Sequence, residues 1–286
     1  MKFRTEISLK KSELNITHST GLLMLGSCFT DNVGALLARD GFDVSCNPLG
    51  ALYNPLSIAT CLERAINADL YTDADLTSGP RGFHCLDYAS RFSSPIASKV
   101  LEDVNSGLSE IHDKLCKPSV AIITFGTSFV FERSDHPGCV VGNCHKFPAN
   151  FFVRRMALAN ESVEIWKRII SSMQSVEKFI FTVSPIRHMA DGFHGNTISK
   201  ANLHLCIEQL VEAFPERVEY FPAYEIMMDD LRDYRFYDKD MVHPSDLAVE
   251  YIYEIFTETY FGRQTIEQAR VFRKEAARAA HRQILS

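Results

Sequence analysis

Short apolar runs alternate along the chain with segments in which apolar residues recur at helical spacing. We predict buried strands at five of these runs, residues 22–25, 42–45, 120–125, 179–183 and 218–221. The third and fourth runs are almost continuously apolar, which is typical of parallel strands that are covered on both faces. The sequence therefore favours a parallel sheet in the interior of the molecule.

Helical patterns lie between and after these strands. Thr30 is a plausible cap of the first helix, and Pro55 suits the first turn of the second. Strands alternating with helices predict a doubly wound α/β fold. We expect one domain over residues 1–286, with its core at about 20–260. The predicted helices are residues 31–38, 56–68, 96–115, 161–173, 198–214, 246–256 and, at the C-terminus, 265–284.

Two segments do not fit this alternation. Residues 71–95 and 126–160 are rich in Gly, Pro and His and have weak periodicity. Loops of this length are usually lids or binding loops. We expect both to be insertions around the edge where the parallel strands end, which is where such sheets bind ligands.

Composition limits the possible partners. The net charge is -6, which argues against a nucleic-acid partner. The N-terminal residues have no signal-like apolar run, and no apolar stretch is long enough to cross a bilayer, so we expect a cytoplasmic protein with no membrane partner. The eight cysteines contain no Cys-x-x-Cys pair, so we expect no metal, and we expect no cofactor.

A serine follows the first predicted strand. Gly26 permits a sharp turn there, and Ser27 then projects from the carboxyl end of the strand, just before a helix. Free N–H groups of the next turn are able to face an oxyanion. Ser27 is therefore a candidate nucleophile, although a serine in this place also suits a helix cap.

A second fragment supplies a base. A serine nucleophile needs an adjacent histidine, and the histidine needs a carboxylate to fix its tautomer. Asp240 lies three residues before His243, and Pro244 disfavours helix at the histidine. The chain order Ser…Asp…His is that of α/β-hydrolases, but Ser128 lacks the second glycine of their Gly-x-Ser-x-Gly turn. A helix cap with an incidental histidine is the alternative.

Together the motifs resemble the GSCFA-domain family. Residues 26–29 read Gly-Ser-Cys-Phe, with Thr30 in place of the final alanine; residues 143–146, 184–188 and 230–245 also look like motifs of that family. The resemblance spans about 20–260. The family is grouped with SGNH, or GDSL-type, hydrolases. This implies a flavodoxin-like three-layer sandwich with a five-stranded parallel sheet, with Ser27 as nucleophile and Asp240 and His243 as its partners.

The resemblance also implies an oxyanion hole, with some departures. Residues 25–27 read Leu-Gly-Ser where SGNH hydrolases have Gly-Asp-Ser. The N–H groups of Ser27 and Gly50 match two of the expected donors. The third donor, an asparagine after the third strand, is missing from Gly-Thr-Ser at 126–128. The candidates for its role are the hydroxyls of Thr127 and Ser128 and the side chains of Asn143 and Asn54.

Other polar residues on the same edge are candidate substrate contacts. Arg187 either binds a substrate carboxylate or phosphate or pairs with Asp191. His188 beside it is a second candidate contact. His145 in the second insertion either contacts substrate or lies in a solvated loop. The tyrosines at 234 and 237 either pack beside the catalytic loop or stack on a sugar.

The motifs and the resemblance favour a serine-dependent ester hydrolase, and the analogy with the SGNH class implies that it removes small acyl groups, such as acetate, from a carbohydrate or a related metabolite. Transfer of the acyl group to an alcohol would make the protein an O-acyltransferase with the same triad. The missing asparagine keeps open a non-catalytic carbohydrate-binding module. A fourth alternative is metal-dependent hydrolysis by His84, Asp87, His145 and His188.

Overall fold

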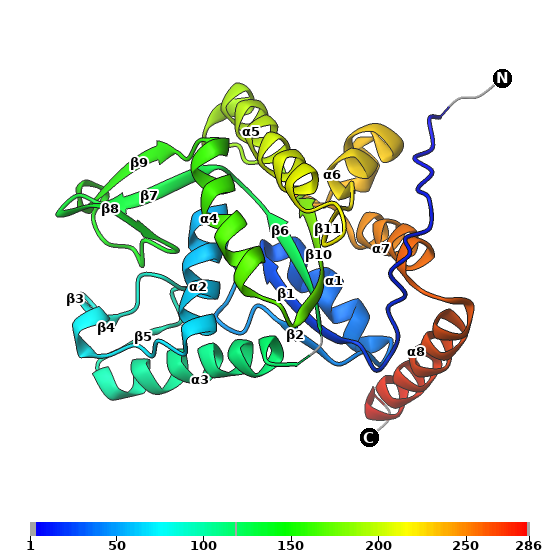
Figure 1. The fold of residues 1–286 in the computed structure, drawn as a ribbon, viewed down its shortest axis with the longest axis horizontal. Coiled ribbons are helices and arrows are strands. Elements are labelled where there is room, and N and C mark those ends of the chain that lie inside the picture. Colours follow the sequence, from blue (N-terminus) through cyan, green and yellow to red (C-terminus); the bar gives the residue numbers. More distant parts are fainter. Residues whose placement is uncertain (1–3, 118, 285–286) are drawn as a thin grey trace.

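The computed structural model describes residues 4–117 and 119–284, and the outermost residues of the expected domain lie outside these ranges (Figure 1). Five parallel strands form the central sheet, in the order β11-β10-β6-β1-β2. Counted along the chain, this is the flavodoxin-like order 2-1-3-4-5. The predicted fold class is confirmed. The strands are β1 (Gly21–Gly26), β2 (Val44–Cys46), β6 (Ser119–Phe125), β10 (Val176–Val183) and β11 (Val218–Tyr220).

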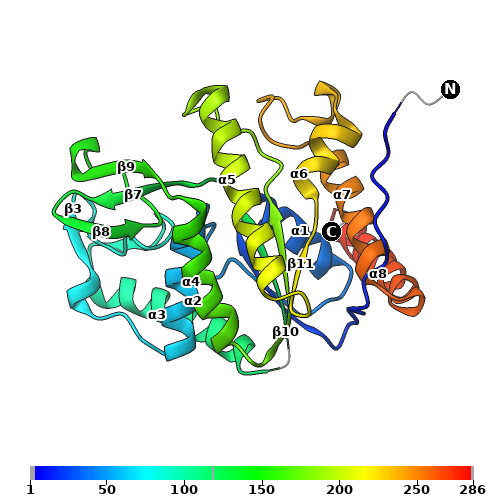
Figure 2. The same ribbon diagram turned by 45° about the horizontal axis from the view of Figure 1, so that its top comes forward.

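Helices cover both faces of this sheet (Figure 2). Alternate side chains of β1 point to opposite faces: Leu23 and Leu25 pack with α2, α3, α4 and α5, whereas Leu22 and Met24 pack with α1 and α7. The helices are α1 (Cys28–Arg39), α2 (Pro55–Asn67), α3 (Ala97–Leu115), α4 (Ala159–Ser172), α5 (Gly192–Ala213), α6 (Ala223–Glu225), α7 (Asp246–Tyr260) and α8 (Arg263–Ile284), with the short turns η3 (Ile226–Leu231) and η4 (Tyr234–Phe236) before α7.

The start of α1 differs from the prediction. Thr30 is not the cap: its N–H donates to Ser27 O at 2.8 Å, so the first turn closes on Ser27 and Thr30 is buried inside the helix. Ser27 holds the N-cap position through its backbone, but its side chain makes no capping hydrogen bond. The Ser27 hydroxyl is therefore left for other contacts.

The two insertions contain antiparallel sheets, where the sequence indicated only loops (Figure 1). Their strands are short and partly exposed, so no regular alternation of apolar residues marks them. The first sheet comprises β3 (Thr77–Gly79), β4 (Gly82–His84) and β5 (Ser93–Ser94), after the turn η1 (Asp73–Asp75). The second comprises β7 (Phe129–Arg133), β8 (His136–Val141) and β9 (Phe152–Met156), with the turn η2 (Ala149–Phe151) before β9.

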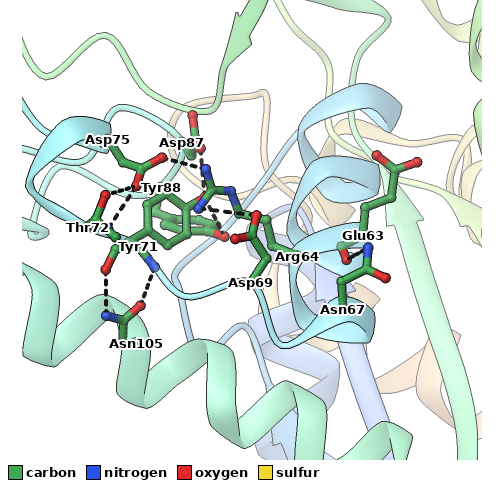
Figure 3. A network of polar contacts seen from close by, with 10 residues as sticks. All are labelled: Glu63, Arg64, Asn67, Asp69, Tyr71, Thr72, Asp75, Asp87, Tyr88 and Asn105. Carbon is green, nitrogen blue, oxygen red and sulfur yellow. Dashed lines mark hydrogen bonds and ion pairs between the residues drawn. The ribbon is translucent and has the colours of Figure 1, made fainter.

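A polar network joins the first insertion to α2 and α3 (Figure 3). The Arg64 guanidinium lies 3.8 Å from the Tyr71 ring centre and donates to Asp75 at 2.6 Å. The Tyr71 hydroxyl donates to Asp87 at 2.7 Å, and Asn105 of α3 bonds both the N–H and the C=O of Tyr71. These contacts hold the insertion against the helices that cover the sheet.

The C-terminal helix is confirmed as α8 and packs beside α1 (Figure 1). Asp40, at the end of α1, is fully buried and pairs with Arg273 of α8. The Tyr253 hydroxyl of α7 also donates to Asp40, at 3.1 Å. One buried carboxylate therefore links three helices. Over the described ranges, no helix has the length and apolar character needed to cross a membrane.

Candidate active site

The turn at the end of β1 admits only glycine. Gly26 has φ +150°, and a Cβ there would lie 2.3 Å from the Thr124 carbonyl oxygen of β6. Its N–H donates to the Asn47 side chain at 2.9 Å, which ties the segment after β2 to the same turn. The chain then enters α1 on one face, whereas the chain leaving β6 leads to α4 on the other. Ser27 therefore lies at the switch point of the sheet, where ligands bind in such folds.

Ser27 is buried at this switch point, with 1% of its surface exposed. Its hydroxyl donates to the hydroxyl of Ser184, at the end of β10, across 3.0 Å. Its N–H donates to Thr124 O at 3.3 Å, a long bond. Both the hydroxyl and the N–H of Ser27 thus have partners within the protein.

Asp240 and His243 are brought together in a tight loop before α7. His243 Nδ1 lies 2.5 Å from Asp240 Oδ2, and Asp240 Oδ1 accepts the N–H groups of His243 and Val242, each at 2.9 Å. These N–H groups, with the His243 ring, lower the pKa of the Asp240 carboxyl to about 2. The carboxylate is therefore ionised near neutral pH and fixes both the loop and the ring.

The loop lies beside the segment that follows β10, because the Arg187 N–H donates to Val242 O at 3.3 Å. No hydrogen bond joins His243 to Ser27 in the described ranges. His243 Nε2 has no partner there, and 47% of the His243 side chain is exposed. The two groups lie at the same carboxyl edge of the sheet.

The predicted oxyanion donors have other partners. The Gly50 N–H closes a turn on Asn47 O at 2.8 Å, so the structure does not offer it to an oxyanion. The Thr127 N–H donates to Tyr53 O at 2.9 Å. The Thr127 hydroxyl accepts from Phe129 N and bonds Ser199 of α5, each at 3.1 Å. Both residues shape the turns around Ser27 without touching it.

The alternative donors also stabilise local structure. The Ser128 hydroxyl donates to Ser199, and Asn54 caps α2 by accepting Ser57 N at 2.8 Å. Asn143 accepts the N–H of His145 at 2.8 Å within the second insertion. None of these side chains bonds Ser27 in the part of the chain that the structure describes.

His145 is a core residue of the insertions, which departs from its predicted role. Its Nε2 lies 2.9 Å from Tyr88 O, and its Nδ1 lies 3.1 Å from Nδ1 of the buried His84. Burial lowers the pKa of both imidazoles. His145 is therefore held inside the protein and not presented to a substrate.

The four residues considered for a metal site do not form one group. His84 and His145 bond each other, Asp87 bonds Tyr71, and His188 lies in the segment after β10. Residues 4–117 and 119–284 contain no group of three or more His, Cys, Asp or Glu side chains placed to hold a metal ion. The structure does not assemble the four-residue metal site.

His188 is half-buried near the Ser27 edge. Its N–H donates to Asn196 at 2.9 Å, and its ring meets that of Tyr53 edge-on at 6.5 Å. Burial, followed by the charge of Lys200, lowers the pKa of His188 to about 4. Its Nε2 is buried and has no hydrogen-bond partner. The imidazole is therefore neutral near pH 7.

Lys200 is a site residue that the sequence analysis missed. It is 2% exposed, and its ammonium donates to Gly126 O and Ser184 O, each at 2.7 Å. Burial lowers its pKa to about 7. No carboxylate among the described residues pairs with it. Its position along the chain does indicate burial, because Lys200 falls on the same face of the helix as Leu203 and Ile207.

Arg187 does not pair with Asp191, which instead pairs with Arg154 at 2.7 Å. The Arg187 guanidinium stands among aromatic rings: its central carbon lies 5.0 Å from the ring centre of Phe193 and 5.7 Å from that of Tyr237. The salt-bridge alternative for Arg187 is therefore wrong.

Comparison with known protein families identifies the family of the chain. The model of the GSCFA family matches residues 21–256, from β1 into α7. The chain belongs to the GSCFA family. The match includes Ser27, Lys200, Asp240 and His243, whereas α8 lies beyond it. No curated protein and no solved structure matches the chain.

Proposed function

We propose that this GSCFA protein is a serine-dependent ester hydrolase of the SGNH class that removes small acyl groups, such as acetate, from a carbohydrate or similar molecule. One observation carries the proposal: Ser27 stands at the switch point of a flavodoxin-like sheet, and the Asp240–His243 pair lies on the same edge. A nucleophile, a base and an orienting carboxylate are the components of a catalytic triad.

The Asp240 contact fixes the role of each ring nitrogen. With Nδ1–H donating to the carboxylate, Nε2 of His243 carries the lone pair. In the proposed reaction Nε2 takes the Ser27 proton as Oγ bonds the ester carbonyl carbon. The ester C–O bond then breaks, and His243 protonates the departing alcohol. Water, deprotonated by His243, attacks the acyl-serine, and the released Ser27 oxygen regains a proton.

The imidazole must first reach Ser27. The Asp240–His243 pair sits in a loop with half-exposed side chains, and in such sites substrate binding often closes the constellation. When the Ser27 hydroxyl turns to Nε2, its bond to Ser184 breaks. The Ser184 hydroxyl then becomes a free donor close to the reacting oxygen.

The release of the Ser184 hydroxyl suggests which group replaces the asparagine that SGNH hydrolases use as the third oxyanion donor. Ser184 is fully buried, and its hydroxyl already lies 3.0 Å from Ser27 Oγ. Lys200 holds the Ser184 carbonyl, and so fixes the residue in place. We infer that the Ser184 hydroxyl donates to the oxyanion, a role in which a preorganised donor typically contributes roughly 3–4 kcal/mol.

Chemical labelling of Ser27 tests the function. A fluorophosphonate probe is expected to label Ser27. 4-Nitrophenyl acetate is expected to acetylate Ser27 and to release a burst of 4-nitrophenol equal to the enzyme concentration. Modification should be absent in Ser27→Ala and retained in Ser128→Ala, because the Ser128 hydroxyl bonds Ser199 and not Ser27. Adding sugar alcohols separates the hydrolase from an O-acyltransferase, because a transferase would form a new ester.

The binding-module alternative also has a supporting observation, the buried Ser27 hydroxyl that bonds Ser184 and not His243. If folded protein shows no acylation at Ser27 by either probe, the hydrolase proposal fails. Binding of carbohydrates without turnover would then establish the alternative.

A further inference from the structure

Arg187 stands in an aromatic cluster beside the proposed catalytic loop. The cluster consists of rings from the first turn of α5 and from the segment at η4: the ring centres of Phe193, Tyr237 and Tyr234 lie 5.0, 5.7 and 5.9 Å from the guanidinium carbon. Arginine stacks well on such rings, and stacking leaves its N–H groups directed along the edge of the guanidinium plane.

Arg187 lacks a carboxylate partner in the described ranges, although Asp191 is close along the chain and Asp233 is in the η4 segment. Asp191 pairs with Arg154, and the Asp233 side chain accepts the N–H of Arg235 and lies near its guanidinium. A partly buried arginine usually has a planar anion as partner, because its fork of donors matches a carboxylate or phosphate. The aromatic cluster therefore holds a cation for which the described residues supply no carboxylate.

Arg187 is on the same segment as the partner of Ser27. The Arg187 N–H bonds the proposed catalytic loop at Val242, and Ser184, three residues earlier, bonds Ser27. The backbone of three residues spans at most roughly 11 Å. Arg187 therefore belongs to the same edge of the sheet as Ser27 and the Asp240–His243 pair.

The surrounding charge also favours an anion. Burial lowers the pKa of His188, and the neighbouring Lys200, His243 and Arg154 lower it further. Burial also lowers the pKa of Lys200 to about 7, so this side chain carries its charge only in part near neutral pH. The whole chain has a net charge of -6, so this positive region is a local feature. A site of this kind attracts anionic ligands.

Two rings of the aromatic cluster are open to solvent, with Phe193 58% and Tyr234 62% exposed. Exposed aromatic rings beside an arginine suit a ligand that has a flat or apolar face next to an anionic group. We propose, resting on the proposed function, that Arg187 binds a carboxylate or phosphate of the ester substrate, so that the protein acts on anionic esters.

Matched esters test this specificity. The substrates are phenyl acetate, its 3-carboxylate and its 3-phosphate, which share one acyl group and differ in charge. Arg187→Gln is expected to lower kcat/KM for the charged ester that the site prefers by roughly 10- to 100-fold, the range for losing a charge-assisted hydrogen bond. Phenyl acetate should change by about twofold or less. The carboxylate and phosphate arms show which anion is bound.

Arg235→Gln is the matched control. Arg235 also stands over a ring, that of Phe236 at 4.9 Å, but it lies near Asp233 and is exposed. It should leave all three rates nearly unchanged. Equal losses for charged and neutral esters in Arg187→Gln would overturn the proposal, because they would indicate a structural role. So would a wild-type protein that does not prefer either charged ester.

A binding measurement separates this inference from the proposed catalysis. In Ser27→Ala protein, which cannot be acylated, calorimetry with 3-acetoxybenzoate and its phosphate analogue measures binding alone. Adding Arg187→Gln should weaken binding of the preferred anion by roughly tenfold or more. If no ester is cleaved but this difference appears, the hydrolase proposal fails and the anion site stands. If esters are cleaved but Arg187→Gln does not weaken anion binding, the anion-site proposal fails and the hydrolase proposal stands.

Discussion

The hydroxyl of Ser27 donates to the hydroxyl of Ser184 across 3.0 Å, in a place where both residues are almost completely buried. The contact links the end of β1 to the end of β10, with β6 between them. Two hydroxyls in a hydrogen bond can exchange roles, so Ser184 is able to donate when Ser27 turns toward another acceptor. Rotation of the Ser27 hydroxyl away from Ser184 is therefore the change that leads from this arrangement to the proposed reaction.

The Ser184 hydroxyl is expected to matter for turnover more than for stability. Ser184→Ala should lower kcat for acetyl esters by roughly 10²- to 10³-fold, as for other lost oxyanion donors. KM should change little, since the donor acts on charge that develops in the transition state. Steady-state kinetics with 4-nitrophenyl acetate provides the measurement. Ser128→Ala is the control, and equal effects of the two changes would remove Ser184 from the mechanism.

The Asp240 carboxylate should be needed for the orientation of His243. Asp240→Asn is expected to lower kcat by roughly 10³- to 10⁴-fold, because an amide favours the wrong tautomer of the ring. Asp238→Asn, in the same exposed loop, should have little effect. The comparison uses kcat values near pH 7 with unfolding curves alongside. A fully active Asp240→Asn protein would exclude His243 as a base oriented by Asp240.

Gly26 should tolerate no side chain. Gly26→Ala places a Cβ 2.3 Å from Thr124 O at φ +150°, so β1 and β6 must separate. We expect a loss of roughly 3 kcal/mol or more in the free energy of unfolding. Gly138→Ala is the control, because Gly138 also has positive φ (+88°) but a Cβ there meets nothing within 4 Å. Urea unfolding of the two variants should differ clearly, and similar losses would contradict the steric argument.

Lys200 should make stability depend on pH. Its pKa falls from a usual value near 10.5 to about 7 on folding, because burial disfavours the charge. Between these values the unfolded chain binds the proton and the folded protein does not, so the free energy of unfolding rises with pH. The rise should be of the order of a few kcal/mol across this window and be lost in Lys200→Met.

Lys167, a half-exposed lysine of α4, provides the matched control for the effect of Lys200 on the pH dependence of stability. Lys167→Met should keep the pH dependence of the wild-type protein, because removing an exposed charge hardly alters proton uptake on unfolding. Urea unfolding at several pH values between 7 and 10 gives the comparison. An unchanged slope in Lys200→Met would show that Lys200 keeps its ordinary affinity for protons in the folded state.

The buried Asp40 should control the docking of α8. Asp40→Ala removes the partner of Arg273 and of the buried Tyr253 hydroxyl, and leaving a buried donor unpaired typically costs roughly 1–3 kcal/mol. Hydrogen exchange in α8 is expected to speed up more than in α5, which has no contact with Asp40. Glu250→Gln, at a more exposed acid near Arg39, serves as the control. Uniform acceleration throughout the chain would indicate global destabilisation instead.

The features that were predicted correctly are those that depend on residues close together along the chain. The strands of the central sheet, α8 and the pairing of Asp240 with His243 follow from local periodicity or short spacing. His145 was assigned less well, because its partner Tyr88 lies in the other insertion. The Gly50 N–H was also assigned less well, although its acceptor, Asn47 O, is only three residues away in a tight turn that the spacing of residues does not reveal. Nothing near Lys200 along the chain indicates that its ammonium meets two carbonyls after β6 and β10.

The polar network around Arg64 attaches the first insertion to α2 and α3, while the turn that carries Ser27 is fixed by main-chain atoms of β1 and β6. The two assemblies use different residues. Exchanges in the outer turn of this insertion, residues 78–83, touch neither assembly and should leave the Ser27 hydroxyl in place. That turn is therefore a part of the insertion in which the sequence can vary without loss of either assembly, unlike the buried residues that follow it.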